Sequence, residues 1–213
     1  LFCVVVVTFR VILGLAIAYA LNSKMTKHKT FFRTVFYMPT VTPLVAVAYV
    51  WMIMYNPQFG LIDKIFGFDI NWLYDSKFAL PSLMIMTIWK DFGYAVILFL
   101  SGLLSLPSDS YESASIDGAN AWQTFRYITL PLLKPTMLFV VVTSIISYLQ
   151  AYVPVLVMTK GGPGTSTYLS SYLVYDQAFK QYNFGYASAI SLFILVLTAI
   201  FTVISFKFTG KNN

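Results

Sequence analysis

The chain contains one cysteine, Cys3, and one histidine, His28, among its 213 residues. A single cysteine has no partner for an internal disulfide, and these two residues leave no plausible zinc set and no Ser-His-Asp arrangement. The sequence also lacks the Gly-x-x-x-x-Gly-Lys-Ser/Thr loop that binds nucleotide phosphates. We therefore expect no catalytic residue, no metal site and no cofactor in this chain.

Charged residues are also scarce. Only 10% of the residues are charged, against about 25% in an ordinary soluble domain, and 58% are hydrophobic. The mean hydropathy is +0.73, so the composition predicts a membrane protein. The net charge of +6 could indicate a nucleic-acid partner, but the basic residues lie between apolar segments rather than in one patch, and we expect no such partner.

Five apolar segments are long enough to cross a hydrocarbon core of about 30 Å, which requires about 20 helical residues. A spanning segment must satisfy its own backbone hydrogen bonds, and no alternating pattern of strand length favours a barrel. The sequence predicts an all-α, polytopic membrane protein of one domain, with spans at residues 4–21, 34–55, 80–106, 135–159 and 184–206.

The distribution of basic residues predicts how these spans cross the lipid bilayer. One set of connecting segments holds most of them: Lys24, Lys27, Lys29, Arg33, Arg126, Lys134, Lys207 and Lys211. The segments on the opposite side hold only Lys64, Lys77, Lys160 and Lys180. By the positive-inside rule, the richer set faces the cytoplasm, and it includes loop 107–135 and the C-terminus.

Residues 107–135 interrupt the apolar pattern with a polar stretch. Ser108 or Asp109 can cap a first helix, whose first turn carries Glu112, and Gly118 then allows a sharp turn. A second amphipathic stretch continues until two prolines end it. The pattern predicts two short helices about a glycine, which either project from the membrane as a knob or lie on the lipid surface.

The order of residues in this loop resembles the EAA signature of permease subunits in binding-protein-dependent ABC importers. Glu112-Ser113-Ala114 matches the first triplet except that Ser113 replaces an alanine, Asp117-Gly118-Ala119 matches the centre, and Leu130-Pro131 matches the end. The resemblance implies that the loop docks in a cleft of a cytoplasmic ATPase. The residues to which it assigns this coupling are Glu112, Ala114, Asp117, Gly118, Ala119, Phe125, Leu130 and Pro131.

Segments outside the loop extend the resemblance to the sugar-permease branch of this family, which includes maltose-type and glycerol-phosphate-type permeases. They include Asn56-Pro57-Gln58-Phe59-Gly60, Thr159-Lys160-Gly161-Gly162-Pro163 and Phe184-Gly185-Tyr186-Ala187, and the match runs from about residue 15 to residue 206. Members of the branch usually have a further N-terminal span. The resemblance therefore implies a type I importer bundle with a sixth span that precedes Leu1.

The resemblance also implies the partners. The chain would form half of the translocation path with a second permease subunit, expected to be a different chain, in a bacterial-type inner membrane. Two copies of a cytoplasmic ATPase would bind ATP and Mg²⁺, and an extracytoplasmic solute-binding protein would deliver a sugar or oligosaccharide. A non-sugar solute such as glycerol phosphate is the alternative within the family.

Polar residues inside spans are costly, so they tend to face a cavity or another helix. Two spans each carry such residues at helical spacing on one face. They are Thr87, Lys90, Asp91 and Tyr94 in the third span and Ser144, Ser147, Tyr148 and Ala151 in the fourth. Hydrogen bonding between helices explains this pattern by itself. The resemblance favours a solute path, because sugar permeases pass the sugar between the corresponding spans.

Three other functional classes fit the sequence less well. A secondary transporter requires coupling residues deep in several spans and an inverted repeat, of which the sequence shows only Lys90 and Asp91. A channel requires a filter-like glycine run at membrane depth, whereas Gly161-Gly162 follows the fourth span. A membrane-bound enzyme requires catalytic groups that the sequence does not offer.

Overall fold

The computed structural model describes residues 1–23, 28–67 and 69–210, and every regular element in these ranges is a helix, which confirms the all-α prediction. Three basic residues used to predict orientation lie outside these ranges: Lys24, Lys27 and Lys211. In chain order the elements are α1 (Phe2–Asn22), α2 (Lys29–Val41), α3 (Leu44–Met54), α4 (Leu61–Phe66), α5 (Ala79–Leu104), α6 (Ser108–Ile116), α7 (Ala121–Thr124), the π-helical turn η1 (Phe125–Thr129), α8 (Leu130–Leu132), α9 (Lys134–Leu149), α10 (Val153–Met158), α11 (Ser170–Tyr175), the π-helical turn η2 (Asp176–Lys180) and α12 (Phe184–Gly210).

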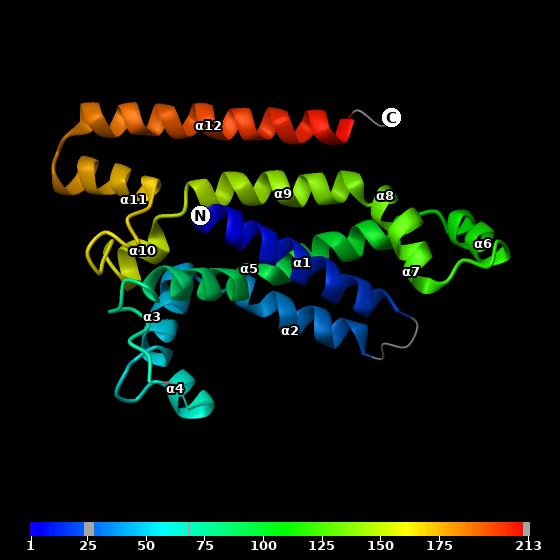
Figure 1. Ribbon diagram of the computed structural model, residues 1–213, viewed down its shortest axis with the longest axis horizontal. Helices are drawn as coiled ribbons and strands as arrows, with labels where there is room; N and C mark the ends of the chain where they lie inside the picture. The colour runs from blue at the N-terminus through cyan, green and yellow to red at the C-terminus, as the bar shows by residue number, and fades with distance from the viewer. Residues whose placement is uncertain (24–27, 68, 211–213) are drawn as a thin grey trace.

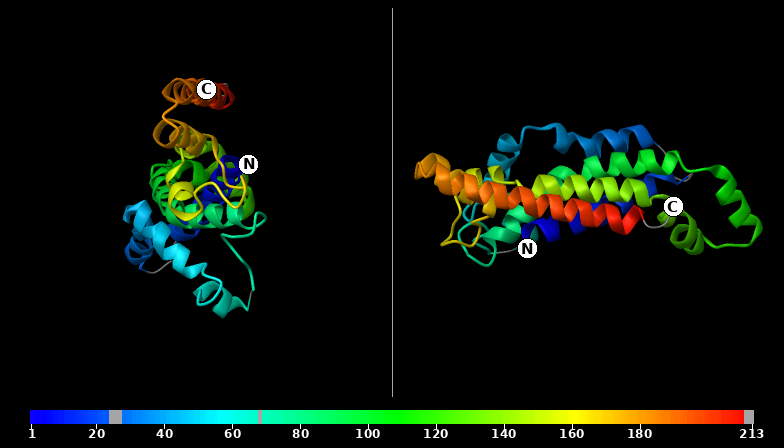
Figure 2. Two further views of the ribbon diagram at one scale, coloured as in Figure 1. Left: turned by 90° about the vertical axis from the view of Figure 1, so that its left-hand side faces the viewer. Right: turned by 90° about the horizontal axis from the view of Figure 1, so that it is seen from above.

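The body of the molecule is a bundle in which α1, α2, α5, α9 and α12 follow one long axis (Figure 1). α1 and α5 pack against each other most extensively, with α9 beside α1 and α2 beside α5. α12 forms an outer layer against α9 (Figure 2). α3, α4, α10 and α11 gather at one end, and α6 to α8 lie at the opposite end (Figure 1). The polar loop is therefore separated from the shorter outer helices by the length of the bundle.

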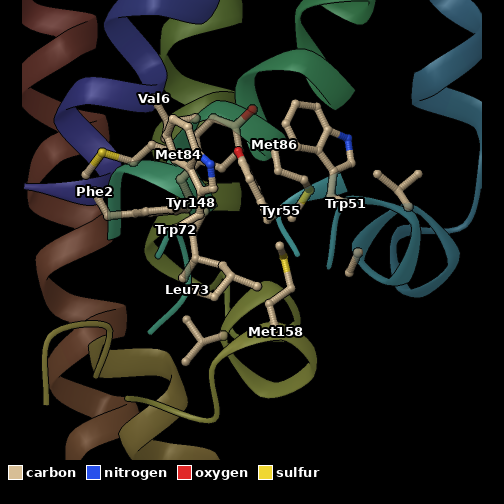
Figure 3. Close-up of a cluster of buried hydrophobic side chains, with 14 of the residues drawn as sticks. Phe2, Val6, Trp51, Tyr55, Trp72, Leu73, Met84, Met86, Tyr148 and Met158 are labelled. Atoms are coloured by element: carbon tan, nitrogen blue, oxygen red, sulfur yellow. The ribbon is translucent and has the colours of Figure 1, made fainter. Parts of the chain in front are cut away.

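Two clusters of buried apolar side chains hold the bundle together. The larger cluster joins α3 and α10 to the first turns of α1 and α5, and contains Trp51, Tyr55 and Trp72 (Figure 3). The smaller cluster contains Phe99 and Leu133, and joins α1, α5 and α9 nearer to α6. Lipid tails are as apolar as these side chains, so close packing rather than exclusion of water stabilises such contacts within a bilayer.

The segment predicted as one span at residues 34–55 is two helices in the structure. α2 ends at Val41, α3 begins at Leu44, and their axes differ by 95°. Pro43 supplies the physical reason, because proline has no N–H and disfavours helical geometry in the preceding residue. Thr42 is accordingly extended, with φ −72° and ψ 136°. α3 therefore turns away from the long axis (Figure 1).

The segment predicted as a span at residues 135–159 is also divided. α9 ends at Leu149, and α10 begins only at Val153. Pro154 lies in the first turn of α10, where a missing N–H costs no intrahelical bond. Backbone that is not helical is tolerated at membrane depth where it lines a cavity, and residues 150–152 meet that condition.

By length and composition, three helices among the described residues are apolar enough to cross a membrane: Phe2–Asn22, Ala79–Leu104 and Phe184–Lys207. The number rises to five if each strongly bent helix pair counts as one span. α12 is exposed along most of its length, with large apolar side chains such as Phe193 and Leu195 on its surface. An apolar helix with so much exposed surface is suited to contact lipid or a neighbouring subunit.

Glycines allow α5 to approach its neighbours closely. A Cβ added at Gly93 would lie 1.8 Å from the carbonyl oxygen of Phe36 in α2. A Cβ added at Gly14 in α1 would lie 2.7 Å from the Cβ of Ala95 in α5. Neither distance is compatible with a side chain, so both helix pairs depend on glycine at these positions.

We expect Gly93→Ala to destabilise the bundle, because the added methyl group meets backbone rather than a flexible side chain. Overpacking of this kind costs about 1–3 kcal/mol. Gly185→Ala is the matched control, since a Cβ at that helical glycine has nothing within 4 Å. Thermal unfolding of the purified variants should show a lower Tm for Gly93→Ala only. Equal Tm values for both variants and the wild type would contradict the close packing of α2 on α5.

Candidate functional site

The polar loop forms a projecting elbow, comprising α6, the turn at Gly118, α7, η1 and α8. α6 leads away from the end of α5, and the chain returns through α7, η1 and α8 to the start of α9 (Figure 1). Figure 2 shows α6 and α7 beyond the ends of α1, α5 and α9. The elbow is therefore accessible to another protein from several sides.

Gly118 makes the turn of the elbow possible. Its φ of +74° lies in the left-handed region, which non-glycine residues rarely adopt. Backbone bonds close the turn, from the Asp117 N–H to the Ser113 carbonyl at 3.0 Å and from the Ala119 N–H to the Ala114 carbonyl at 2.9 Å. Apart from its chain neighbours, no residue in the described part of the chain would lie within 4 Å of a Cβ at Gly118, so the space around it is open to a partner.

A capping box that the sequence analysis missed begins α7. The Asn120 side chain accepts a hydrogen bond from the Gln123 N–H at 2.9 Å, and Gln123 Oε1 accepts one from the Asn120 N–H at 2.8 Å. The signal was present as the spacing Asn-x-x-Gln. The expected side-chain cap on α6 is not formed, because α6 begins directly after the extended Pro107 and Ser108 donates to Asp109 instead.

Side-chain contacts join α6 to η1 within the elbow, and join the elbow to the bundle. The hydroxyl groups of Tyr111 and Thr129, 3.0 Å apart, join α6 to η1. The ring of Phe125 packs edge-on against Tyr19 of α1, with centroids 4.7 Å apart. An aromatic pair of this kind adds about 0.5–1.5 kcal/mol beyond its burial. These contacts connect α6 to α1 through η1.

The eight residues predicted to couple the elbow fall into two groups. Glu112, Asp117 and Gly118 are exposed and can meet a partner, whereas Ala114 is buried and the other four are half-buried. Three exposed apolar side chains were not predicted: Ile116, Trp122 and Tyr127. Exposed apolar and aromatic groups beside a carboxylate are typical of a protein docking surface.

A polar pocket of about 250 Å³ lies where α9 breaks before α10, opposite the middle of α5. Gln150 and Tyr152, in the break, add an amide and a phenol to its lining. The structure brings together at this pocket six of the eight residues predicted for the solute path: Thr87, Lys90, Asp91, Ser147, Tyr148 and Ala151. The hydroxyl-rich faces of the third and fourth predicted spans thus face each other.

Hydrogen bonds and one ion pair connect three helices at the pocket. Tyr148 donates to Asp91 Oδ2 at 3.1 Å, and Asp91 Oδ1 lies 3.5 Å from Lys90 Nζ. Lys90 Nζ also donates to the Thr40 carbonyl at 3.1 Å, and Thr40 Oγ1 donates to the Lys90 carbonyl at 3.0 Å. Lys90 thereby binds the C-terminal end of α2, where a cation is favourable.

Tyr94 and Ser144 were also predicted for the solute path, but the structure places them around Arg10 of α1. Arg10 is 6% exposed, and its Nη1 donates to Ser144 Oγ at 2.9 Å. Its guanidinium carbon lies 5.5 Å from the ring centre of Tyr94 and 5.6 Å from that of Tyr148. Arg10 was not among the predicted site residues, although a charge inside an apolar span indicates a functional position by itself.

A larger groove of about 860 Å³ lies between α3, α4 and α5. Its walls include Trp51, Trp72 and Trp89, and nearly all of its surface is apolar. Such walls offer few groups that bond hydroxyls, so the smaller pocket is the better candidate for a polar solute.

α11 and η2 lie beside the pocket and are held there by contacts to the break. Ser171 Oγ donates to the Ala151 carbonyl at 2.6 Å, and the rings of Tyr152 and Tyr175 stack 5.7 Å apart. One wall of the pocket therefore depends on the position of α11.

Asp176 organises the polar side chains of η2. It accepts a hydrogen bond from the Tyr168 hydroxyl at 2.6 Å and pairs with Lys180 Nζ at 2.9 Å. These hydrogen bonds, that from Tyr168 first, hold the pKa of Asp176 below its ordinary value of 3.8. Burial, together with the neighbouring Asp176 carboxylate, raises the pKa of Tyr168 to about 12.

Comparison with known proteins places this geometry among transport proteins. The profile of the family described as "Binding-protein-dependent transport system inner membrane component" matches residues 10–209, which include both the elbow and the pocket. A probable ABC transporter permease protein of Pyrococcus horikoshii is 38% identical over 204 residues, covering 92% of this chain and 69% of its own length. The trehalose/maltose transport system permease protein MalF of Thermococcus litoralis is 36% identical over 213 residues, covering 97% of this chain and 70% of its own length.

A solved structure has the same fold. It is that of a bacterial alginate ABC transporter in complex with an alginate pentasaccharide-bound periplasmic protein. One of its chains superimposes with a TM-score of 0.83 at 22% identity, over 96% of this chain and 73% of that one.

We expect α11 and η2 to loosen in acid, because protonation of Asp176 removes its pairing with Lys180. A carboxyl whose pKa is lower in the folded state stabilises the fold above its ordinary pKa, and this contribution is lost as the pH falls below about 4. The pair is partly exposed, so the effect is roughly 1 kcal/mol or less. The measurement is Tm at pH 7 and at about pH 2, below both the ordinary and the lowered pKa of Asp176.

Asp176→Asn should show a smaller acid-induced fall in Tm than the wild type. Asp69→Asn removes an exposed carboxylate from the same end of the molecule, and its Tm should fall in acid by as much as that of the wild type. An equal fall in all three proteins would show that Asp176 does not stabilise this segment.

Proposed function

This chain belongs to the family of binding-protein-dependent transport system inner membrane components, and we propose that it is the permease subunit of an ATP-driven importer. The observation that carries the proposal is the elbow: an exposed pair of short helices about Gly118, beyond the ends of the bundle and attached to α1 and α9. A structure of this kind is suited to be gripped by a separate subunit.

The elbow acts as a lever in the proposed mechanism. Closure of a cytoplasmic ATPase dimer around ATP displaces α6, and the contact between Phe125 and Tyr19 passes the displacement to α1. ATP shifts the equilibrium between the two conformations of the transporter only to the extent that the ATP-bound ATPase binds one conformation more tightly than the other. ATP and Mg²⁺ bind to the ATPase, so the role of this subunit is mechanical rather than catalytic.

The polar pocket is proposed to be part of the solute path, and the solute to be a sugar or oligosaccharide. Ser147, Gln150 and Asp91 offer hydroxyl, amide and carboxylate groups to the hydroxyl rim of a sugar ring. Tyr148 and Tyr152 offer aromatic surface to its apolar face. The relation to a trehalose/maltose permease supports the same class of solute.

The arrangement of the two ends supports the remaining parts of the proposal. The elbow and the C-terminal end of α12 lie at the same end of the molecule (Figure 1), and both carry basic residues, so both are proposed to face the cytoplasm. α10, α11 and η2 then face an extracytoplasmic solute-binding protein. A second permease subunit, proposed to be a different chain, completes the translocation path. Two copies of the ATPase bind to the pair of permease subunits.

We expect Gly118→Asp to abolish ATP-dependent uptake by the importer reconstituted in liposomes. The new side chain occupies the open space beside the turn and strains a left-handed backbone by about 1–2 kcal/mol. Glu112→Lys, which reverses an exposed charge on α6, should also uncouple ATP hydrolysis from uptake. Both variants are tested by stimulated ATPase activity and by uptake.

Gly67→Asp is the matched control for Gly118→Asp. Gly67 also has a positive φ of +69°, and apart from its chain neighbours no described residue lies within 4 Å of its Cβ position, but it ends α4 at the opposite end of the molecule. This variant should transport normally. Normal coupling in Gly118→Asp, or an equal loss in Gly67→Asp, would contradict the lever.

We expect Tyr148→Phe to lower uptake by about tenfold or more, because a hydrogen bond to a charged group is worth about 1.5–3 kcal/mol. The change removes the bond to Asp91 but keeps the ring beside Arg10. Tyr94→Phe is the control, since Tyr94 also contacts Arg10 but does not line the pocket. Equal uptake by the two variants would remove the pocket from the solute path.

A further inference from the structure

The charged side chains at and near the polar pocket carry a net positive charge, which a neutral sugar would leave uncompensated. Lys90 and Asp91 form one ion pair. Arg10 is buried, and the structure shows no carboxylate within 4 Å of it among the residues that it describes. The three charged groups in this part of the bundle therefore carry a net charge of +1.

Arg10 acts on the pocket through Tyr148. Its guanidinium lies against the ring of Tyr148, and the same tyrosine lines the pocket and donates its hydroxyl to Asp91. The Nε of Arg10 is buried and has no hydrogen-bond partner among the described residues. A charge in an apolar interior is costly unless an opposite charge lies near it, and the low dielectric there makes the attraction effective over a distance.

Lys90 is the cation that a solute can reach, because it lines the pocket. An ammonium has three N–H donors, and the structure gives Lys90 Nζ two neighbours, the Thr40 carbonyl at 3.1 Å and Asp91 at 3.5 Å. The second distance exceeds the roughly 2.7–2.9 Å of a charge-assisted hydrogen bond. Lys90 therefore retains donor capacity for a ligand.

We infer that the solute carries an anionic group, a carboxylate or a phosphate, which binds beside Lys90 in the polar pocket. The inference rests on the proposed function and narrows its solute class. A carboxylate brings the local charge from +1 to zero, and a phosphate, with a charge of about −1.5 to −2 at pH 7, brings it to about −0.5 to −1, whereas a neutral sugar leaves the excess unchanged. Ser147 and Gln150 bond the uncharged part of the solute. Arg10 is a positioning residue, because its charge attracts the anionic group without contacting it.

The test measures binding of three probes to the purified complex of both permeases and the ATPase, without the solute-binding protein. The probes are a short oligogalacturonate, a hexose 6-phosphate and a neutral oligogalactose, each radiolabelled and followed by equilibrium dialysis. One anionic probe should bind about tenfold or more tightly than the neutral one, which corresponds to about 1.4 kcal/mol. Which anionic probe is preferred distinguishes a carboxylate from a phosphate.

Variants of the charged residues show which side chains cause the preference for an anionic probe over the neutral one. Lys90→Gln should reduce it to about twofold or less, whereas Lys90→Arg, which keeps the charge, should retain most of it. Lys64→Gln, which removes an exposed cation on α4, is the matched control and should leave it unchanged. Arg10→Gln should lower the preference and Arg10→Lys should keep it. Size-exclusion chromatography confirms assembly of each complex.

The inference is overturned if the neutral probe binds the wild type as tightly as both anionic probes, or if Lys90→Gln weakens all three probes equally. A second measurement, ATP-dependent uptake of the same probes by the full importer, distinguishes failure of this inference from failure of the proposed function. Uptake of the neutral sugar alone would leave the importer assignment standing and reject the anionic solute. Absence of ATP-dependent uptake for any saccharide by an assembled complex would reject the importer assignment itself.

Discussion

Lys90 and Asp91 form the charged pair around which the bundle is arranged. Lys90 binds the C-terminal end of α2, and Asp91 accepts the hydroxyl of Tyr148 in α9. The ring of Tyr148 in turn lies against Arg10 of α1. Polar groups inside an apolar bundle are costly unless bonded, and these contacts satisfy such groups while they link four helices. The same contacts leave a polar pocket beside the pair.

α9 connects this pocket to the elbow. It begins at Lys134, directly after α8, and it ends at Leu149, where the break lines the pocket. Its 16 residues span about 24 Å at 1.5 Å per residue. A helix with the elbow at one end and the pocket at the other links the proposed docking surface directly to the proposed solute path. The contact of Phe125 with Tyr19 provides a second route, through α1.

The elbow and most of the pocket could be predicted from sequence because both depend on local spacing. Gly118 between two short helical patterns indicated the turn, and the residues at 87, 90 and 91 share one face of any α-helix. The breaks between α2 and α3 and between α9 and α10 were not predicted, because the hydropathy of a segment indicates how long an apolar helix can be but not where its axis changes direction. Pro43 and Pro154 carried the signal for both, but a proline inside an apolar run permits either a kink or a helix start.

The sequence by itself determined that the chain is helical and apolar, that one polar elbow interrupts it, and that two helical faces are polar. These properties depend on residues within a few positions of each other. Only the tertiary structure decided what those faces meet. Arg10 and Ser144 are 134 positions apart and Thr40 and Lys90 are 50 apart, and such pairs form only when helices pack. Helical periodicity specifies which side of a helix is polar, but the packing of neighbouring helices selects the partner.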